Sequence, residues 1–572
     1  MNILSDSWLP VIRDKNKTKS NEDTISIYNL LSDYEVNPVV DIVAPRPDLR
    51  NAIYQLFIGI VQVVMTPQSP IEWAKQFDSP PNEEKFKELL DTIKLFFEID
   101  NSVAAFMQDL ELKEGEEKPI ASIFIESPGA KTIKDNLDHF VKRDTITTLD
   151  PYWAAIALYT LQTFAPSGGV GHRVGVRGGG PLTTMVIPLD KPEHKVTLWE
   201  KLWTNILTKS EIESTCKAAD FDKTELQSIF PWLKPSKISE GKGTELYPQE
   251  CNPLHVYFAM PRRIRLVFSD KMGVCSLTGK ECQKVVTGFI TKNYGNNYSG
   301  PWIHPLNPYR IDMKNTDEPP LSIKGQPGGV HYRHWLGLTV GYADLIPASV
   351  LHYIEQDLTK RVVLRKKDIV LWAAGYDMDN MKARSWHEST MPYYVFDENA
   401  DLSNINAFKN DVRTLIETSG EIIYSLRSAV RKAWFKDPSS PTAKKADFSF
   451  LENAFTQNTE QKFYSVLNTL YSNITSQTLK DIRAAAGKEW HQCLQRECLK
   501  LFEQWCFTSQ DGQKDLKKIF QIRKELINWI LFGKEIKLLK LWYDDTVDKE
   551  IKDKNKSKKK KQSSKGGPDN DR

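Results

Sequence analysis

The sequence predicts an α+β protein in which a large, irregular mixed domain precedes a C-terminal four-helix bundle. Its 572 residues exceed the length over which a single hydrophobic core normally grows, so two or more domains are expected. Up to about residue 400, short strand-like runs alternate with helical patterns and many Pro and Gly breaks. From residue 401 the apolar positions recur with helical spacing. We therefore expect a mixed domain at 1–400, a bundle at 401–545 and a tail at 546–572.

Within the mixed domain, three apolar stretches predict individual elements. Ile53 to Met65 is apolar but interrupted by polar residues, and it falls short of the roughly 20 apolar residues that span a bilayer, so it predicts a buried helix. Ile264 to Phe268 alternates charged and apolar residues, as a half-buried strand does. Arg361 to Leu364, with two adjacent valines, predicts a second strand.

The C-terminal region predicts four amphipathic helices. Apolar residues follow helical spacing within 412–433, 448–470, 479–494 and 516–530. Loop signals rich in Pro, Ser, Asp and Gly stand at 437–441 and 509–512. Four helices with short connections favour a four-helix bundle.

The charge of the chain is concentrated at its end. The net charge of the whole sequence is only +3, so any contact with nucleic acid has to come from local patches. The segment 546–572 is rich in lysine, with a run at 558–561, and such a composition cannot bury a core. It predicts either a solubilising tail or a salt-sensitive contact with a nucleic-acid backbone.

The seven cysteines do not form a recognisable framework. The first residues lack a secretory signal, so we expect reduced thiols in a cytoplasmic protein without a membrane anchor. Cys275 and Cys282 flank a short loop, but a zinc site would normally show a second close pair of ligands. The spacing therefore favours two reduced cysteines over a structural zinc ion.

Catalytic motifs of the common hydrolases are absent from the sequence. Neither His-Glu-x-x-His nor Gly-x-Ser-x-Gly occurs, and the pair His387-Glu388 is most simply a polar surface pair. The spacing of the carboxylates does not single out an acid and a base. The sequence therefore favours a binding protein over an enzyme.

The most informative segment is the glycine-rich run from Ala165 to Pro181. It contains seven Gly and two Arg in 17 residues, and glycine lets the backbone come close to a ligand. The run matches neither the dinucleotide-binding fingerprint nor the phosphate-binding loop of nucleotide hydrolases. By itself it is equally consistent with a flexible surface loop and with a binding loop.

Several segments together resemble one protein family. They are Met1–Val11, the run Arg177-Gly-Gly-Gly-Pro-Leu-Thr-Thr184, Thr287–Phe289, Gly300–Pro305 and Ala374–Tyr376. In this order and spacing they resemble CasA, the large subunit of the type I-E CRISPR Cascade complex, over residues 1 to about 545. The helical C-terminus is similar to the four-helix bundle of that family.

This resemblance implies a non-catalytic, DNA-binding subunit of a prokaryotic antiviral ribonucleoprotein. Such a subunit reads the protospacer-adjacent motif (PAM) of double-stranded DNA from the minor groove, starts the strand separation that forms the R-loop, and recruits a separate helicase–nuclease. Base pairing with the guide RNA (crRNA) supplies most of the sequence specificity. The implied partners are crRNA, target DNA and the backbone, small and guide-end subunits, and no cofactor is required. The alternatives are a pure scaffold subunit and a metal-dependent nuclease whose site is assembled in space.

For motif reading, the resemblance implies a glycine loop and a nearby lysine. The loop falls on Ser167, Gly168, Gly169 and Val170, where Val170 replaces a residue that is often Gly in the family. Strict counting places Asn293 at the position of the lysine, while Lys292 beside it is the residue that brings charge. Both can donate to an acceptor in the minor groove.

For strand opening, the resemblance implies a wedge at a hairpin tip. It falls on Asp379 and Asn380, flanked by Met378 and Met381, whose apolar side chains could unstack a base pair. Two aspartates beside DNA phosphates depart from the family pattern, and an ordinary polar hairpin tip is the alternative.

A further segment implied by the resemblance contacts the guide RNA or a neighbouring subunit. Phe140 would stack on a base, and Lys142 and Arg143 would bind phosphates. A hydrophobic anchor on another protein is the equal alternative for Phe140.

Overall fold

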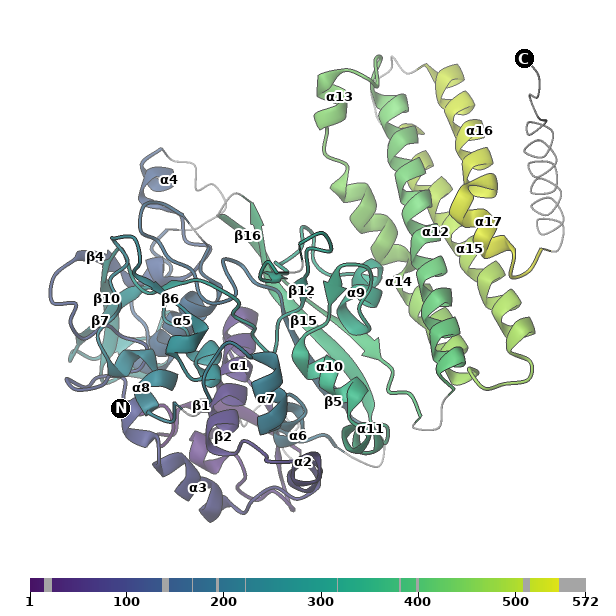
Figure 1. The fold of residues 1–572 in the computed structure, drawn as a ribbon. Helices are drawn as coiled ribbons and strands as arrows, with labels where there is room; N and C mark the ends of the chain where they lie inside the picture. Colours follow the sequence, from purple (N-terminus) through teal and green to yellow (C-terminus); the bar gives the residue numbers. More distant parts are fainter. Residues whose placement is uncertain are drawn as a thin grey trace, which may run out of the picture. The chain divides into compact units, whose positions relative to one another are not determined.

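The chain forms two compact units (Figure 1). The first comprises Met1–Val330 and Gly337–Glu398, and the second comprises His331–Leu336 and the chain from residue 399. The computed structural model describes residues 1–14, 23–135, 143–166, 168–191, 195–221, 223–315, 317–379, 382–397, 401–507 and 515–544.

The longer strands in the described part of the first unit form three antiparallel sheets. Their strand orders are β2-β1-β3, β4-β10-β7 and β16-β15-β5. The strands are β1 (Leu9–Arg13), β2 (Asp23–Ile25), β3 (Val39–Ile42), β4 (Glu116–Pro119), β5 (Thr183–Leu189), β7 (Arg263–Ser269), β10 (Val285–Lys292), β15 (Asp368–Asp379) and β16 (Lys382–Tyr393). The expected strand at 264–268 is confirmed as part of β7.

Shorter elements connect these sheets. The short strands are β6 (Glu245–Leu246), β8 (Gly273–Val274), β9 (Glu281–Cys282), β11 (Asn297–Tyr298), β12 (Tyr309–Arg310), β13 (Leu321–Ser322) and β14 (Leu345–Ile346). The short helices are α2 (Pro70–Asp78), α3 (Glu83–Asp91), α4 (Ala130–Lys134), α6 (Leu198–Trp203), α7 (Lys209–Thr215), α8 (Leu226–Ile229), α9 (Trp335–Thr339), α10 (Ser349–Gln356) and α11 (Leu358–Leu364).

Two buried helices lie at the centre of the first unit. They are α1 (Pro47–Val64) and α5 (Pro151–Phe164), which pack against each other. Both have Pro in the first turn, where its missing N–H costs no hydrogen bond, and the Asp150 side chain caps α5. The expected buried helix at 53–65 is thus confirmed within α1. Among the described helices, none has the length and apolar character that a bilayer crossing requires.

The strand expected at Arg361–Leu364 is wrong, because this segment belongs to helix α11. The Asp357 side chain accepts a hydrogen bond from the backbone N–H of Lys360 and starts the helix. Lys360 and Leu364 are then buried one turn apart. The cap and this packing override the β propensity of the two valines.

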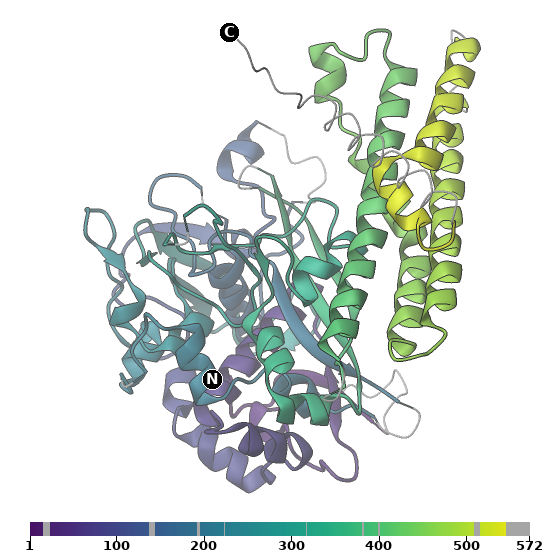
Figure 2. The same cartoon turned by 45° about the vertical axis from the view of Figure 1, so that its right-hand side comes forward.

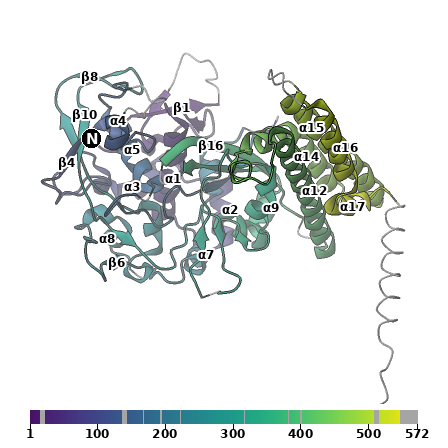
Figure 3. The ribbon, with the colours of Figure 1, turned by 90° about the horizontal axis from the view of Figure 1, so that it is seen from above.

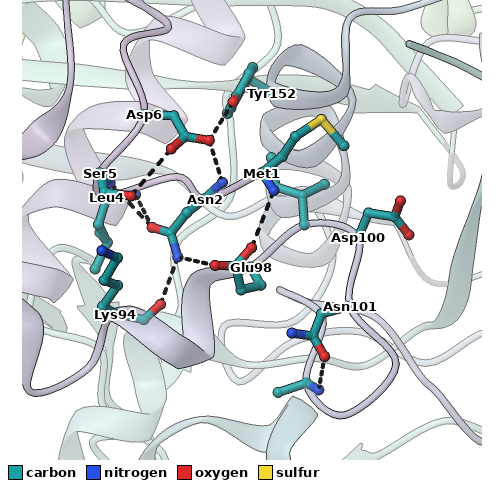
Figure 4. A network of polar contacts seen from close by, with 12 residues as sticks. Met1, Asn2, Leu4, Ser5, Asp6, Lys94, Glu98, Asp100, Asn101 and Tyr152 are labelled. Atoms are coloured by element: carbon teal, nitrogen blue, oxygen red, sulfur yellow. Dashed lines mark hydrogen bonds and ion pairs between the residues drawn. The ribbon is translucent and has the colours of Figure 1, made fainter. Parts of the chain in front are cut away.

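The N-terminal segment that carries part of the family resemblance is tied into the first unit by polar bonds (Figure 4). The Asn2 amide donates to the carbonyl oxygen of Lys94 at 2.8 Å and to the Glu98 carboxylate at 3.1 Å. Asp6 accepts from the Asn2 backbone N–H and from the Tyr152 hydroxyl, each at 2.7 Å. These bonds explain the polar residues of the opening motif as structural residues.

The second unit is a helical bundle, as expected. Its long helices α12 (Leu402–Trp434), α14 (Ser449–Ser472), α15 (Leu479–Phe507) and α16 (Leu516–Phe532) run side by side, with shorter α13 (Pro441–Lys445) and α17 (Lys534–Lys540) (Figures 2 and 3). This confirms the α+β architecture with a C-terminal bundle.

The segment 331–336 joins the bundle through several side chains, among which Tyr332 is buried in the bundle core. The Tyr332 hydroxyl is 2.7 Å from the Ser419 hydroxyl and 3.0 Å from that of Thr459. The Tyr332 ring stacks on Phe463 with 4.5 Å between centroids. A hydrophobic pattern read along the C-terminal helices alone cannot reveal this contribution from an earlier part of the chain.

Candidate nucleic-acid interface

The structure brings the glycine loop and the end of β10 together. The Asn293 side-chain amide donates to the carbonyl oxygen of Val170 at 2.7 Å. The backbone N–H of Tyr294 donates to the carbonyl oxygen of Gly171 at 2.9 Å. Gly171 has φ +75°, and a Cβ there would lie 2.9 Å from the Asn293 Cβ. A residue with a side chain at 171 would therefore push the two segments apart.

The side chains at this junction face solvent. Val170 is 74% exposed, and Gly169, Lys292 and Asn293 are exposed as well, while Gly168 is half-buried. Ser167 lies outside the described residues. Lys292 makes no ion pair with any residue in the described part of the chain, so its charge is available to an external anion or base edge.

Arg262 binds both ends of the exposed glycine loop. Its guanidinium donates to the carbonyl oxygen of Pro166 at 2.7 Å and contacts the Nδ1 of His172. Burial lowers the pKa of Arg262 to about 10. Burial and the neighbouring Arg262 also lower the pKa of His172, so the imidazole is neutral near pH 7 and Nδ1 can accept. Nothing in the sequence around Arg262 identifies it as a loop residue.

The second half of the glycine-rich run is partly buried, with Arg177 in the core. Arg177 donates to the Gln55 amide oxygen at 2.7 Å and to the Thr183 hydroxyl at 2.9 Å, and burial lowers the pKa of Arg177 to about 10. Lys324 donates to the carbonyl oxygen of Arg177, and its own pKa falls to about 8, mainly through burial. The run thus divides into an exposed loop around Gly169 and a structural part around Arg177.

The β15–β16 hairpin packs against this structural part. Gly180 has φ +58°, and a Cβ there would lie 2.6 Å from the Met378 side chain. Met378 is half-buried in this contact, which limits its freedom as an apolar wedge. The rings of Phe164 and Trp386 meet edge-on at 5.4 Å. The base of the hairpin is therefore fixed to the same core as the glycine-rich run.

The aspartates of the hairpin have a cationic partner. Arg384 on β16 donates to the Asp377 carboxylate at 2.7 Å and lies 4.0 Å from that of Asp379. Asp377 is buried, whereas the Asp379 side chain is 69% exposed. The pairing reduces the negative charge that the tip would present to phosphates. Asn380 and Met381 lie outside the described residues.

Of the segment expected to contact guide RNA, only Arg143 lies within the described residues. Its guanidinium donates to the carbonyl oxygen of Ile133 at 3.0 Å. Phe140 and Lys142 lie outside the described residues, so their role stays a prediction.

Cys275 and Cys282 lie on the β8–β9 hairpin. The Cys282 thiol is 3.4 Å from the Asp150 carboxylate, and burial and this carboxylate raise the pKa of Cys282 to about 12. In the part of the chain that the structure describes, no three His, Cys, Asp or Glu side chains gather closely enough to hold a metal ion. The Cys282 thiol is therefore protonated near neutral pH.

Comparison with known proteins gives a consistent result. Residues 2–501 match the family model of the CRISPR-associated protein Cse1. Solved structures share the fold at low identity. Cse1 of Thermobifida fusca matches with a TM-score of 0.66 and 14% identity over 95% of this chain and 98% of that chain. CasA of Thermus thermophilus matches with a TM-score of 0.62 and 14% identity over 93% and 99%. A CRISPR RNA-guided surveillance complex contains a chain with a TM-score of 0.57 and 13% identity over 92% and 99%.

Proposed function

The chain belongs to the Cse1 family of CRISPR-associated proteins, and on that premise we propose that it is the large, non-catalytic subunit of a Cascade complex. One structure of the same fold is a CRISPR RNA-guided surveillance complex. In this proposal the subunit reads the PAM of double-stranded DNA, starts R-loop formation beside the guide RNA and recruits a helicase–nuclease.

The observation that carries the motif-reading role is the hydrogen bond between Asn293 and Val170. It joins two segments 123 residues apart in sequence into one exposed surface that also bears Lys292. The exposed backbone of Gly169, next to the half-buried Gly168, allows close approach to base edges. Lys292 and the loop then form a donor-rich edge suited to the acceptors of the minor groove.

Within this surface the two candidate residues have different roles. Asn293 already donates one amide hydrogen to the loop, so its main role is to hold the loop in place. Lys292 has no such bond, so it is the direct donor to DNA. Because a single lysine reads a degenerate pattern of acceptors, we expect tolerance for several related motifs.

Strand opening is assigned to the tip of the β15–β16 hairpin. The bulge between Asp377 and Met378 increases the local twist and redirects the tip. Asp379 lies at the end of β15 in a hairpin whose base is fixed, which is what a wedge between base pairs requires, and Asn380 follows it in the sequence. Arg384 keeps the aspartates compatible with nearby phosphates.

The experiment is equilibrium binding of the guide-loaded complex to matched duplex DNA carrying a library of flanking motifs. Lys292→Ala is expected to weaken binding to the preferred flank about tenfold, the size of one good base contact. Asn380→Ala should leave duplex affinity close to wild type while slowing strand opening, measured with a 2-aminopurine reporter. The matched control is Lys271→Ala, another exposed lysine of the first unit.

The result that contradicts the proposal is equally specific. If binding is indifferent to the flank and to Lys292, and strand opening is indifferent to Asn380, the subunit is a scaffold. Mg²⁺-dependent cleavage of DNA by the purified chain would instead support the nuclease alternative. Binding of Phe140→Ala, Lys142→Ala and Arg143→Ala complexes to crRNA tests the guide contact separately.

A further inference from the structure

Four aromatic side chains gather where α12 ends and α14 begins in the second unit. They are Trp434, Phe448, Phe450 and Trp505. Trp434 is 43% exposed and Trp505 is 37% exposed. Large exposed aromatic rings are uncommon on a surface that meets only water, because their burial is strongly favourable.

These rings are held in place before any ligand arrives. Trp434 stacks on Phe450 with 5.9 Å between centroids and 12° between planes. Trp505 lies 4.6 Å from Phe450. The indole N–H of Trp434 donates to the carbonyl oxygen of Trp505 at 3.1 Å. Because the side chains are already ordered, a ligand that stacks on them loses little additional conformational entropy.

The chain on both sides of Trp434 is rich in basic residues. Residues 431–447 contain five basic and two acidic residues, so this short stretch alone carries as much net positive charge as the whole chain. The basic residues are Arg431, Lys432, Lys436, Lys444 and Lys445, and the last four are exposed. The guanidinium of Arg431 lies 5.2 Å from the centre of the Phe448 ring.

The two acidic residues of this stretch are occupied by local bonds. Asp437 accepts from the backbone N–H and the hydroxyl of Ser439, at 2.9 and 2.6 Å. Asp447 accepts from the backbone N–H of Ser449 at 2.8 Å. Lys436, Lys444 and Lys445 are exposed and form no close ion pair with other described residues, although Lys444 contributes to lowering the pKa of Asp437.

We propose that this bundle-end surface, made of Trp434, Phe450, Trp505, Lys436, Lys444 and Lys445, binds a single-stranded nucleic acid. Unpaired bases stack on the exposed indoles, and the lysines hold the phosphates. A duplex hides its base faces and cannot use the rings. An apolar protein partner leaves the uncompensated lysines without a counter-charge.

Within the proposed function, strand separation leaves one DNA strand unpaired, and the bundle-end surface suits that strand. This part of the inference rests on the proposed function. Binding of an oligonucleotide to the isolated full-length chain does not, because it requires neither guide RNA nor a PAM.

The experiment measures fluorescence anisotropy of labelled oligo-dT and oligo-rU, each about 20 nucleotides long, with the full chain. Trp434→Ala with Trp505→Ala is expected to weaken binding about tenfold or more, the equivalent of one stacked base. Lys436→Glu with Lys444→Glu and Lys445→Glu should weaken it similarly and reduce its salt dependence. The charge variant leaves the aromatic packing intact, so it remains informative if the tryptophan variant fails to fold.

Two controls are matched to these variants. Trp529→Ala removes a tryptophan that is 59% exposed on α16, about 20 Å along that helix from its first residue. Lys480→Glu with Lys488→Glu reverses exposed lysines of α15. Both should bind like the wild type. The relative affinity for oligo-dT and oligo-rU distinguishes a DNA strand from guide RNA.

Three results would overturn the inference. They are no oligonucleotide binding by the wild type, equal binding by wild type and charge variant, and equal losses in the Trp529 control. The first would leave the aromatic cluster as a protein contact. The charge variant should keep its PAM discrimination, because the PAM-reading residues lie in the first unit. This readout therefore distinguishes a failure of the single-strand inference from a failure of the proposed function.

Discussion

The two units stabilise their interiors in different ways. In the first unit, buried charged side chains link segments that are far apart in sequence, such as Lys360 with Glu211 at 2.6 Å and Arg263 with Asp109 at 2.7 Å. In the bundle, the described interior is mostly apolar, and ion pairs such as Lys462 with Glu489 lie at the exposed rim.

The cause of this difference is the backbone. A long helix satisfies its own N–H and C=O groups, so the bundle needs only an apolar face between helices. The short strands and irregular segments of the first unit leave backbone groups to be satisfied by side chains. Gln162 and Asn205 donate hydrogen bonds to backbone carbonyl oxygens. Arg177 donates to the buried side chain of Gln55. Single polar substitutions should therefore damage the first unit more than the bundle.

The largest difference is expected for matched lysine substitutions. Lys360→Met leaves the Glu211 carboxylate buried without its cation, which costs about 3–5 kcal/mol. Lys462→Met breaks a solvent-exposed pair with Glu489 and costs about 0–1 kcal/mol. Urea unfolding of both variants measures the two losses. Equal losses would show that the two units do not differ in their dependence on buried charge.

Alanine at two glycines should have opposite effects in the two units. A Cβ at Gly325 would lie 2.0 Å from the backbone oxygen of Tyr376 in β15, so Gly325→Ala should destabilise by about 3 kcal/mol through overpacking. Gly420 is exposed within α12, with nothing within 4 Å of its added Cβ. Gly420→Ala should stabilise by about 1 kcal/mol, the difference in helix propensity. Differential scanning calorimetry measures the change in stability of each variant. If both changes have the same sign, the contrast between the two units is wrong.

One buried carboxylate in the bundle departs from its apolar pattern. Asp411 on α12 pairs with Arg483 on α15 at 2.6 Å, yet burial outweighs this ion pair and raises the pKa of Asp411 to about 6. An unfolded aspartate titrates near pH 4. The folded state therefore binds the proton more tightly, and stability falls as the pH rises from about 4 to about 6, by roughly 2–3 kcal/mol.

The measurement is the unfolding free energy of wild type and Asp411→Asn at both pH values. Asp411→Asn should not show this loss of stability between the two pH values, because its side chain does not titrate. Arg483→Met should enlarge the decrease, since it removes the group that lowers the pKa. Parallel pH profiles for wild type and Asp411→Asn would contradict the assignment.

The same difference between the units explains what the sequence could predict. Helices at 412–433 and 448–470 follow from local periodicity, and the structure contains them as α12 and α14. Packing of Tyr332 into the bundle depends on contacts 87 and 127 residues away, which periodicity cannot report. In the first unit, the apolar pattern found α1 and β7 but misassigned α11, where a side-chain cap decides the structure.

The candidate site was predictable in its parts but not in its assembly. The glycine-rich run and the segment around Lys292 were identified from composition and family resemblance, yet no local pattern indicates that Asn293 bonds to Val170. Arg262 was missed entirely, because its bond to His172 spans 90 residues and its neighbours form an ordinary strand start. Contacts of this kind are properties of the folded chain.

The smallest expected effect concerns a helix end in the bundle. Helix α17 follows Gly533, which has no side chain to cap it. Instead, the Glu421 carboxylate of α12 accepts from the backbone N–H groups of Lys534 and Glu535, at 2.9 and 2.8 Å. Glu421→Ala should cost about 1 kcal/mol, like the loss of an ordinary N-cap with its charge.

The measurement is the shift in Tm of the bundle transition, expected to fall by about 2–4 °C. Glu421→Gln keeps an acceptor oxygen but loses the charge, so its Tm should lie between those of the wild type and Glu421→Ala. The Glu421 carboxylate on α12 caps a different helix, α17. It is therefore a tertiary polar contact, like those that link distant segments in the first unit. If its loss shifts Tm as strongly as Lys360→Met, the bundle depends on polar links as much as the first unit does.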